Sequence, residues 1–263
     1  MSISKKQLIE AIEKIAPPEL MEVWDNTGIQ ISAGSEEVSR VLVCLDVCDE
    51  TVDEAVEKNC DFIVSHHPMF FEGIKSITED NAKGRQIIKL ITNGISVYSS
   101  HTSFDTVQGG NNDYLANIIG LNSVTAPEEE PIMRVGRLEK PAAMRDLCDL
   151  VNREIMKGKG LSYAGELDSI VHTVGICTGA GASLMSAACR SGCDVLITGD
   201  VKYHDYQRAD ELGIKIIDAG HYETEILFTE NMGEKLKALL GDKVEIIPCP
   251  MQKNSLKRYD CMV

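Results

Sequence analysis

Residues 41–68 read VLVCLDVCDETVDEAVEKNCDFIVSHHP, and this stretch decides the fold because residues 174–201, VGICTGAGASLMSAACRSGCDVLITGDV, repeat its pattern. The two stretches align without a gap at a constant offset of 133 residues, so that Cys60-Asp61 corresponds to Cys193-Asp194. Each reads as an apolar strand, a turn, a helix of about ten residues and a second buried strand, which is a βαβ unit. The repeat therefore predicts an α/β protein with two pseudo-repeated lobes.

The similarity between the halves continues downstream of each βαβ unit. NGISVYSSHTSFD in the first half and LGIKIIDAGHYETE in the second both read as a glycine that ends a helix, then a strand, then His-x-x-x-carboxylate. His101 and Asp105 are thus the positional counterparts of His221 and Glu225.

This pattern predicts how the chain of residues 1–263 is organised. A first α/β lobe is expected over residues 38–125, a crossover over 126–168 and a second α/β lobe over 169–250. The crossover contains a predicted helix over 142–156, and an amphipathic helix is expected to open the chain and to end at Pro17.

The charge balance limits the classes of partner. The chain has 26 Lys and Arg against 41 Asp and Glu, a net charge of −15, so it lacks the basic surface that nucleic-acid binding needs. We expect no direct nucleic-acid partner. No apolar run approaches the roughly 18–20 residues that span a bilayer, and the first twenty residues do not read as a signal peptide. We therefore expect a cytoplasmic protein without membrane contact.

The cysteines predict structural thiols. There are nine, an odd number, and none forms a CxxC pair, which argues against a disulfide framework and against a thiolate zinc site. Most lie within aliphatic runs such as VLVCLDV, where a reduced cysteine behaves as a small buried hydrophobe.

The histidines carry the functional signal. Five of the six closely follow apolar strand-like runs: His66, His67, His101, His204 and His221. Binding sites of open α/β sheets gather beyond the carboxyl ends of the strands. In two clusters a carboxylate lies four residues on, where a helix would present it on the same face. Imidazole and carboxylate without thiolate suit Zn²⁺, Mn²⁺, Fe²⁺ or Co²⁺.

The arrangement favours more than one ion. Adjacent side chains on an extended backbone diverge, so His66 and His67 suit two neighbouring ions better than one. A carboxylate can bridge two ions roughly 3.5–4 Å apart, and Glu225 and Asp105 are the candidates. His204 has no carboxylate at this spacing and is a candidate orienting residue or general acid/base. A lone histidine after a strand is usually structural, but three clusters together favour metal.

Two further motifs leave alternatives open. The stretch from Gly179 to Ser183 could offer backbone N–H groups to a phosphate, but it lacks the third glycine of a dinucleotide fingerprint, and a tight structural turn is favoured. Trp24 to Gly28, WDNTG, contains the only tryptophan and a turn-forming Asp-Asn pair. It predicts either a substrate contact or a buried corner.

Taken in order, WDNTGIQ, SHHPMFF, SHTSFDTVQGGNNDYLA, CTGAG, LITGDVKYHD and DAGHYETE resemble the Nif-three-like, or YbgI-like, dinuclear metal-binding family, whose members are often labelled GTP cyclohydrolase I type 2 homologues. The resemblance runs from about Trp24 to Glu225. It implies two divalent metal ions per subunit, with Glu225 shared between them. The implied ligands are His66, His67, Asp105, His221 and Glu225. His101 and His204 are implied to line the same site.

The resemblance also implies a Nif-three-like fold of two α/β lobes with the dinuclear site between them, assembled as a toroidal homohexamer. The extra domain that longer members insert between the lobes is expected to be absent. The expected function is a metal-dependent hydrolase acting on a small anionic, nucleotide-like or phosphorylated substrate, with GTP ring opening as the named candidate and His204 or His101 as the catalytic proton carrier. The alternatives are a non-catalytic metal-binding scaffold or regulator, and a metal chaperone or storage protein.

Overall fold

The computed structural model describes residues 1–249 and 252–257, and the chain forms two compact units. The first unit contains residues 1–107 and 228–253, and the second contains residues 108–227 together with the described residues after Lys253. The predicted boundaries differ from these units, because residues 108–125, predicted in the first lobe, and the predicted crossover over 126–168 belong to the second unit. Residues 228–250 are predicted in the second lobe. In the structure they are part of the first unit, because the strand over residues 245–248 pairs with the strand over residues 40–44.

The first unit is built on one five-stranded sheet with strand order β13-β4-β5-β6-β2. The first four strands are parallel to their neighbours, and β2 is antiparallel to β6. A two-stranded antiparallel pair, β1 with β3, accompanies this sheet. The elements of this unit are β1 (Ile3–Ser4), α1 (Lys5–Ile15), η1 (Pro18–Leu20), β2 (Gly28–Ile31), β3 (Glu37–Val38), β4 (Arg40–Cys44), α2 (Asp49–Glu57), β5 (Phe62–Ser65), α3 (Ala82–Thr92), β6 (Ser96–Ser99), α4 (Thr102–Thr106), α10 (Phe228–Leu240), η3 (Gly241–Lys243) and β13 (Glu245–Pro248).

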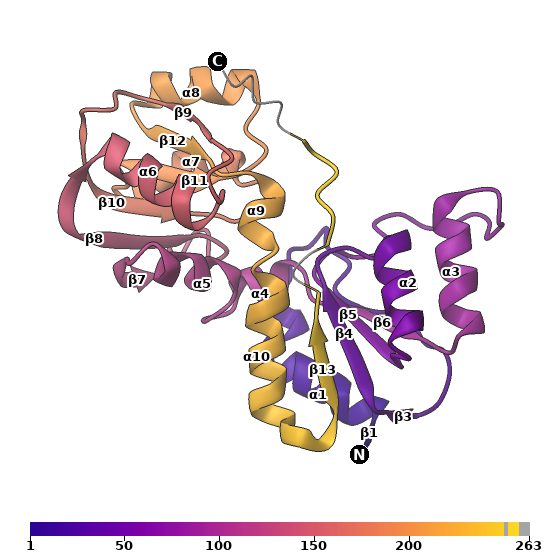
Figure 1. The fold of residues 1–263 in the computed structure, drawn as a ribbon. Helices are drawn as coiled ribbons and strands as arrows, with labels where there is room; N and C mark the ends of the chain where they lie inside the picture. The colour runs from indigo at the N-terminus through magenta and orange to yellow at the C-terminus, as the bar shows by residue number, and fades with distance from the viewer. Residues whose placement is uncertain (250–251, 258–263) are drawn as a thin grey trace. The chain divides into compact units, whose positions relative to one another are not determined.

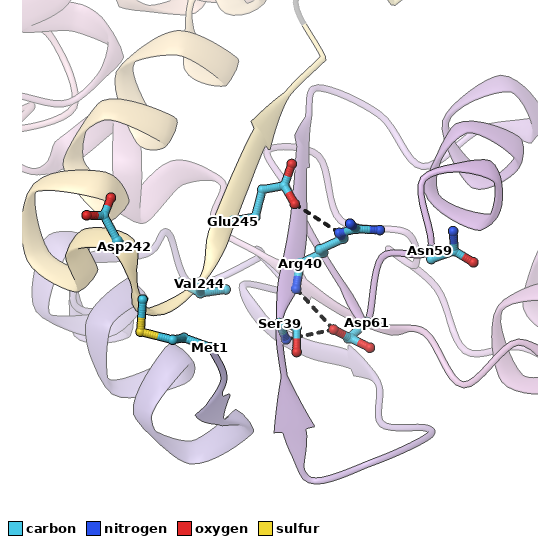
Figure 2. A pocket seen from close by; sticks show the side chains of 8 residues that line it. All are labelled: Met1, Ser39, Arg40, Asn59, Asp61, Asp242, Val244 and Glu245. Carbon is cyan, nitrogen blue, oxygen red and sulfur yellow. Dashed lines mark hydrogen bonds and ion pairs between the residues drawn. The ribbon is translucent and has the colours of Figure 1, made fainter.

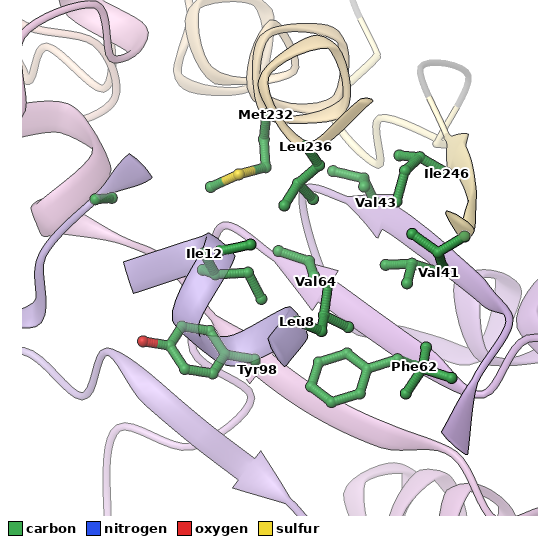
Figure 3. Packing of buried hydrophobic residues seen from close by; sticks show 14 of the residues in the cluster. Leu8, Ile12, Val41, Val43, Phe62, Val64, Tyr98, Met232, Leu236 and Ile246 are labelled. Carbon is green, nitrogen blue, oxygen red and sulfur yellow. The ribbon is translucent and has the colours of Figure 1, made fainter. Parts of the chain in front are cut away.

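Helices cover both faces of this sheet, α1 and α10 on one side and α2 and α3 on the other (Figure 1). Successive side chains of a strand point to opposite faces. In β4, Val41 and Val43 pack with α1 and α10, whereas Leu42 and Cys44 pack with α2 and α3. Figure 3 shows the first of these two cores. Because both faces are buried, the strands read as the continuous apolar runs typical of parallel sheets.

The second unit contains a six-stranded sheet with strand order β7-β8-β10-β11-β12-β9. Strands β10, β11 and β12 are parallel, and the outer strands are antiparallel to their neighbours. Its elements are α5 (Asn111–Ile118), β7 (Asn122–Thr125), β8 (Arg134–Ala143), α6 (Met144–Glu154), β9 (Ser162–Ala164), β10 (Ile170–Ile176), η2 (Ala182–Leu184), α7 (Met185–Arg190), β11 (Val195–Thr198), α8 (Tyr203–Leu212), β12 (Lys215–Asp218) and α9 (His221–Glu225).

The sequence repeat is a repeat of strand register. Val41 lies opposite Phe62 in the parallel pair β4/β5, and Val174 lies opposite Val195 in the parallel pair β10/β11. Val174 and Val195 lie 133 residues after Val41 and Phe62, which is the offset between the two sequence stretches. The two predicted βαβ units and the α/β class are therefore confirmed.

The helices predicted outside the repeat are also confirmed. Helix α1 begins after Ser4, whose hydroxyl accepts the backbone N–H of Gln7 while the Gln7 side chain accepts the Ser4 N–H, a reciprocal capping box. Helix α6 lies within the predicted range 142–156. Within residues 1–249 and 252–257, no helix is long and apolar enough to cross a bilayer.

The cysteines in the described part of the chain are all free thiols. Burial raises the pKa of Cys60 and of Cys148 to about 11 and that of Cys193 to about 12. These thiols are therefore protonated near neutral pH, which fits their predicted structural role. Cys261 lies outside the described residues.

Candidate metal site

Three histidines of the first unit lie together where neighbouring parallel strands end. His66 and His67 directly follow β5, and His101 lies two residues beyond β6. One ring nitrogen from each of the three lies within 4.8 Å of the others, which makes the group able to hold a metal ion. The ring centroid of His66 is 5.2 Å from that of His67 and 5.2 Å from that of His101. The structure thus brings these histidines together at the predicted edge of the sheet.

His66 is fully buried, and its two ring nitrogens have different surroundings. Nδ1 lies 3.0 Å from the carbonyl oxygen of Ser100, to which a proton on this nitrogen donates. Nε2 lies 3.5 Å from Oδ2 of Asp105, a buried carboxylate on α4. Two of the predicted ligands are therefore direct neighbours in this unit.

His67 is oriented by a carboxylate that the sequence analysis did not single out. Its Nδ1 lies 2.7 Å from Oδ1 of Asp46, which follows β4. A proton on Nδ1 donates to this carboxylate, so that Nε2 carries the ring's lone pair. Such a carboxylate fixes the tautomer and the ring orientation of metal-binding histidines and raises their basicity.

His101 is held in the same way by Asp25, whose side chain is fully buried. The distance from His101 Nδ1 to Asp25 Oδ1 is 2.8 Å, and Asp25 Oδ2 accepts hydrogen bonds from the backbone N–H and the hydroxyl of Thr102. Asp25 belongs to the WDNTG motif, so this motif contributes a buried corner through its carboxylate. The neighbouring Trp24 is 64% exposed and lies edge-on to His101 with ring centroids 5.9 Å apart.

The environment of Asp25 favours its ionised form. Burial alone would raise the pKa of Asp25, but the hydrogen bond and electrostatic attraction of His101, with hydrogen bonds from Thr102 and Asn26, outweigh burial. Together they hold the pKa of Asp25 well below its ordinary value of 3.8.

We predict that Asp25→Asn lowers the free energy of unfolding and that the loss depends on pH. Because the folded-state pKa is depressed, the ionised carboxylate stabilises the fold fully above the unfolded-state value, about pH 4, and this contribution is lost as pH falls towards the folded-state pKa. In urea unfolding between neutral pH and pH 3, the difference between wild type and variant should be largest at neutral pH and smaller in acid. A difference that stays constant across this range would contradict the prediction.

The second unit contributes a histidine and carboxylate pair on one short helix. His221 and Glu225 begin and end α9, and His221 Nε2 lies 2.8 Å from Glu225 Oε2. The predicted placement of this pair on one helix face is therefore confirmed. His221 Nδ1 lies 2.7 Å from Oδ2 of Asp200, so a third histidine is oriented by a carboxylate. Asp200 has a left-handed backbone with φ of 53°, which Asp tolerates better than most residues.

Gly179 allows the loop after β10 to approach Glu225 closely. Its φ is +69°, and a Cβ at this position would lie 2.0 Å from Glu225 Oε1. The Gly179 N–H donates to the hydroxyl of Thr224, which in turn donates to the carbonyl of Gly220. This N–H therefore serves the packing of α9, which supports the interpretation of the glycine-containing stretch as a structural turn.

His204 has different surroundings from the other candidates. It is exposed in the first turn of α8, where its Nδ1 lies 2.9 Å from Gln207 Oε1 and its ring lies 5.2 Å from that of Tyr203. Among residues 1–249 and 252–257, the groups able to hold a metal ion do not include His204. The structure therefore gives His204 local contacts on its own helix.

The three orienting carboxylates, Asp25, Asp46 and Asp200, are the site residues that sequence reasoning did not assign. Asp46 and Asp200 each lie two residues beyond the last residue of a parallel strand, β4 and β11. A position just after a strand is also the pattern that identified the histidines. The same search for carboxylates would have found Asp46 and Asp200. Asp25 has no comparable signal, because its partner is 76 residues away in the sequence.

A polar cavity of about 520 Å³ lies elsewhere on the first unit (Figure 2). Arg40 and Glu245 line it at the first residues of β4 and β13 and form an ion pair with 2.9 Å between Nε and Oε2. Because β4 and β5 are parallel, this end of the sheet is opposite to the end that His66 follows. The cavity is therefore separate from the histidine cluster.

Comparison with known proteins places this arrangement in a family. The model of the family Duf34/NIF3 (NGG1p interacting factor 3) matches residues 3–255. A relative from Clostridium acetobutylicum, named GTP cyclohydrolase 1 type 2 homolog, is 36% identical, with 98% of this chain and 99% of the relative covered. A protein from Helicobacter pylori, named GTP cyclohydrolase 1 type 2, is 31% identical over 84% of this chain and 86% of its own.

The fold is shared with a solved structure as well. The crystal structure of a Bacillus cereus protein related to NIF3 has a TM-score of 0.90 at 22% identity and covers 98% of this chain and 99% of that chain. The family match from residue 3 to residue 255 and the 36% identity to a relative covered almost from end to end agree. The chain belongs to the DUF34/NIF3 family.

Proposed function

We propose that this protein is a dinuclear metal-dependent hydrolase that acts on a small anionic, nucleotide-like substrate. The observation that carries the proposal is the pairing of three histidines with carboxylates: His67 with Asp46, His101 with Asp25 and His221 with Asp200. A carboxylate on Nδ1 is the typical outer partner of a metal-binding histidine, and the same pairing orients a histidine that acts as a general base. Its occurrence three times is not expected for structural histidines.

The donor set fits divalent ions of intermediate hardness. The proposed ligands of two ions are His66, His67, Asp105, His221 and Glu225, with Glu225 shared between the ions. Imidazole and carboxylate donors suit Zn²⁺, Mn²⁺, Fe²⁺ or Co²⁺. The close approach of Gly179, which leaves no room for a side chain against Glu225 Oε1, supports a fixed position for this carboxylate. Two ions in such a site supply Lewis acidity for attack by water on an electrophilic carbon or phosphorus.

Among the histidines, His101 is the residue we propose to carry the proton. A proton on Nδ1 donates to Asp25, which leaves Nε2 able to accept a second proton, and the ionised carboxylate stabilises the resulting imidazolium. His204 is the other catalytic candidate from the sequence, but its Nδ1 faces a neutral amide. The buried carboxylate partner favours His101 for this role.

Two aromatic rings beside His101 suit a planar substrate. Trp24 and Phe71 are 64% and 55% exposed, and each lies edge-on to His101 with ring centroids 5.9 and 5.6 Å away. Exposed aromatic faces stack on heterocyclic bases. Since relatives are named for GTP cyclohydrolase activity, GTP is the first substrate to test.

We predict that the purified protein, stripped with a chelator and reloaded with Zn²⁺, Mn²⁺, Fe²⁺ or Co²⁺, hydrolyses GTP or a member of a phosphoester panel only in the reloaded form. His101→Gln should lower kcat by about 10²–10⁴-fold, the usual contribution of a general acid/base, while the metal content measured by mass spectrometry stays unchanged.

His172→Gln is the matched control, because this histidine is exposed, its Nδ1 lies 3.7 Å from Asp194 Oδ2, and among the described residues it belongs to none of the groups able to hold a metal ion. Its kcat should equal that of wild type. No turnover with any of the four metals would overturn the enzyme proposal, and stable metal retention in that case would favour the scaffold or storage alternatives.

We also propose that the active form is a toroidal homohexamer. The support is the family resemblance of the metal motifs. Light scattering should then give six times the chain mass of 28.8 kDa, and a monomer or dimer mass would contradict the proposal.

A further inference from the structure

Gln252, which follows β13 in the sequence, is a buried residue that forms hydrogen bonds with both the oxygen and the nitrogen of its side-chain amide. It is 7% exposed. Its Oε1 accepts the backbone N–H groups of Leu45 and Asp46 at 3.1 and 3.0 Å, and its Nε2 donates to Asp46 Oδ2 at 3.1 Å. The two N–H donors require an oxygen and the carboxylate requires an NH₂ group, so these partners fix the orientation of the amide.

These contacts act on the carboxylate that orients His67. Asp46 uses Oδ2 towards Gln252 and Oδ1 towards His67 Nδ1, at 3.1 and 2.7 Å. The Asp46 side chain is 46% exposed, and an exposed side chain loses conformational entropy when it is held in one rotamer. Gln252 holds both the backbone and the carboxylate of Asp46, and so offsets that cost before any ligand binds.

We propose that Gln252 is a positioning residue of the metal site, which acts through Asp46 to fix the tautomer and ring orientation of His67. This inference rests on the proposed metal-binding function. The chain Gln252, Asp46, His67 connects the segment after β13 to the end of β5 through hydrogen bonds of 3.1 and 2.7 Å. The backbone N–H groups need an acceptor and the Asp46 carboxylate needs a donor. The amide of Gln252 provides both, whereas a carboxylate provides only the acceptor.

Gln252→Glu is the decisive substitution because it keeps the size and one acceptor oxygen but sets a carboxylate against Asp46. Lys253→Ala is the control for the segment itself, since Lys253 is exposed and its Nζ lies 4.0 Å from Oε1 of Glu50, which is also exposed. The control removes a neighbouring side chain and leaves the contacts of Asp46 in place.

The first measurement uses long-range ¹H–¹⁵N spectra of the imidazoles in chelator-treated protein. We expect wild type and Lys253→Ala to show His67 with its proton on Nδ1, and Gln252→Glu to show a shift towards the Nε2–H tautomer. The second measurement is Zn²⁺ affinity by chelator competition. Because removing an outer partner of a ligating histidine typically costs about 10–100-fold in metal affinity, we expect Gln252→Glu to weaken Zn²⁺ binding about tenfold and Lys253→Ala to leave it unchanged.

An unchanged His67 tautomer in a folded Gln252→Glu protein would overturn the inference, as would equal Zn²⁺ affinity in the two variants. Gln252→Ala repeats the tautomer measurement if the glutamate variant does not fold. Since the tautomer is read without metal or substrate, its result does not depend on turnover. A changed tautomer in a protein that never binds metal would support the role of Gln252 and reject the proposed function.

Discussion

Glu225→Gln is expected to abolish hydrolysis and to reduce the bound metal from two ions to one or fewer per chain. The amide keeps the shape of the side chain but removes the charge that lies 2.8 Å from His221 and that we propose both ions share. Charge stabilisation worth several kcal/mol corresponds to a rate loss of about 10³-fold or more, at roughly 1.4 kcal/mol per tenfold. Metal content by mass spectrometry, and turnover of GTP or of the phosphoester that wild type hydrolyses, measure the two effects.

Glu223→Gln is the matched control on the same helix. Glu223 is also buried, but its Oε1 lies 3.6 Å from Lys159 Nζ and accepts a hydrogen bond from Asn254 at 3.1 Å. It therefore has other partners than His221. We expect this variant to retain two ions and wild-type turnover, and equal losses in both variants would contradict a specific role for Glu225.

Gly179→Ala is expected to empty the same site without unfolding the protein. The added Cβ would lie 2.0 Å from Glu225 Oε1 and 3.5 Å from His221 Nε2. Since the carboxylate oxygen is at the end of a flexible side chain, Glu225 moves more easily than the backbone does. The bound metal and the activity should therefore fall nearly as far as in Glu225→Gln.

Gly192→Ala separates this displacement from backbone strain. Its φ is +74°, close to the +69° of Gly179, but a Cβ there meets nothing within 4 Å. A left-handed non-glycine residue costs roughly 1–2 kcal/mol, so both variants should show a similar decrease in melting temperature. Only Gly179→Ala should lose metal, and metal loss in Gly192→Ala would show that strain alone explains the effect.

The internal repeat explains how much of the fold was predictable from sequence. Apolar runs of matching length predicted the parallel strands, whereas their register, which pairs Val41 with Phe62 and Val174 with Val195, comes from the structure. The repeat does not predict that residues 228–253 belong to the first unit. Strand pairing between β13 and β4 depends on a distant edge of the sheet, and a strand pattern carries no information about which edge it joins.

The candidate site, like the fold, has a part that local sequence patterns predict and a part that depends on distant residues. Histidines after strands are found by counting, because parallel strands end at one edge of a sheet. The pairing of His101 with Asp25 and the contact of Asp46 with Gln252 are set by loops that cross between elements, at separations of 76 and 206 residues. Local sequence patterns do not predict contacts at such separations.

The first unit is discontinuous in sequence, and this has a consequence for the order of events during synthesis. Residues 108–227 of the second unit are continuous and can fold as soon as they leave the ribosome, whereas β4 waits for β13, about 200 residues later, to complete its sheet. Closing so long a loop is entropically slow. A nascent chain therefore exposes the histidines after β5 in an unfinished sheet, and under the proposed function the metal site would be complete only once translation has passed Gln252.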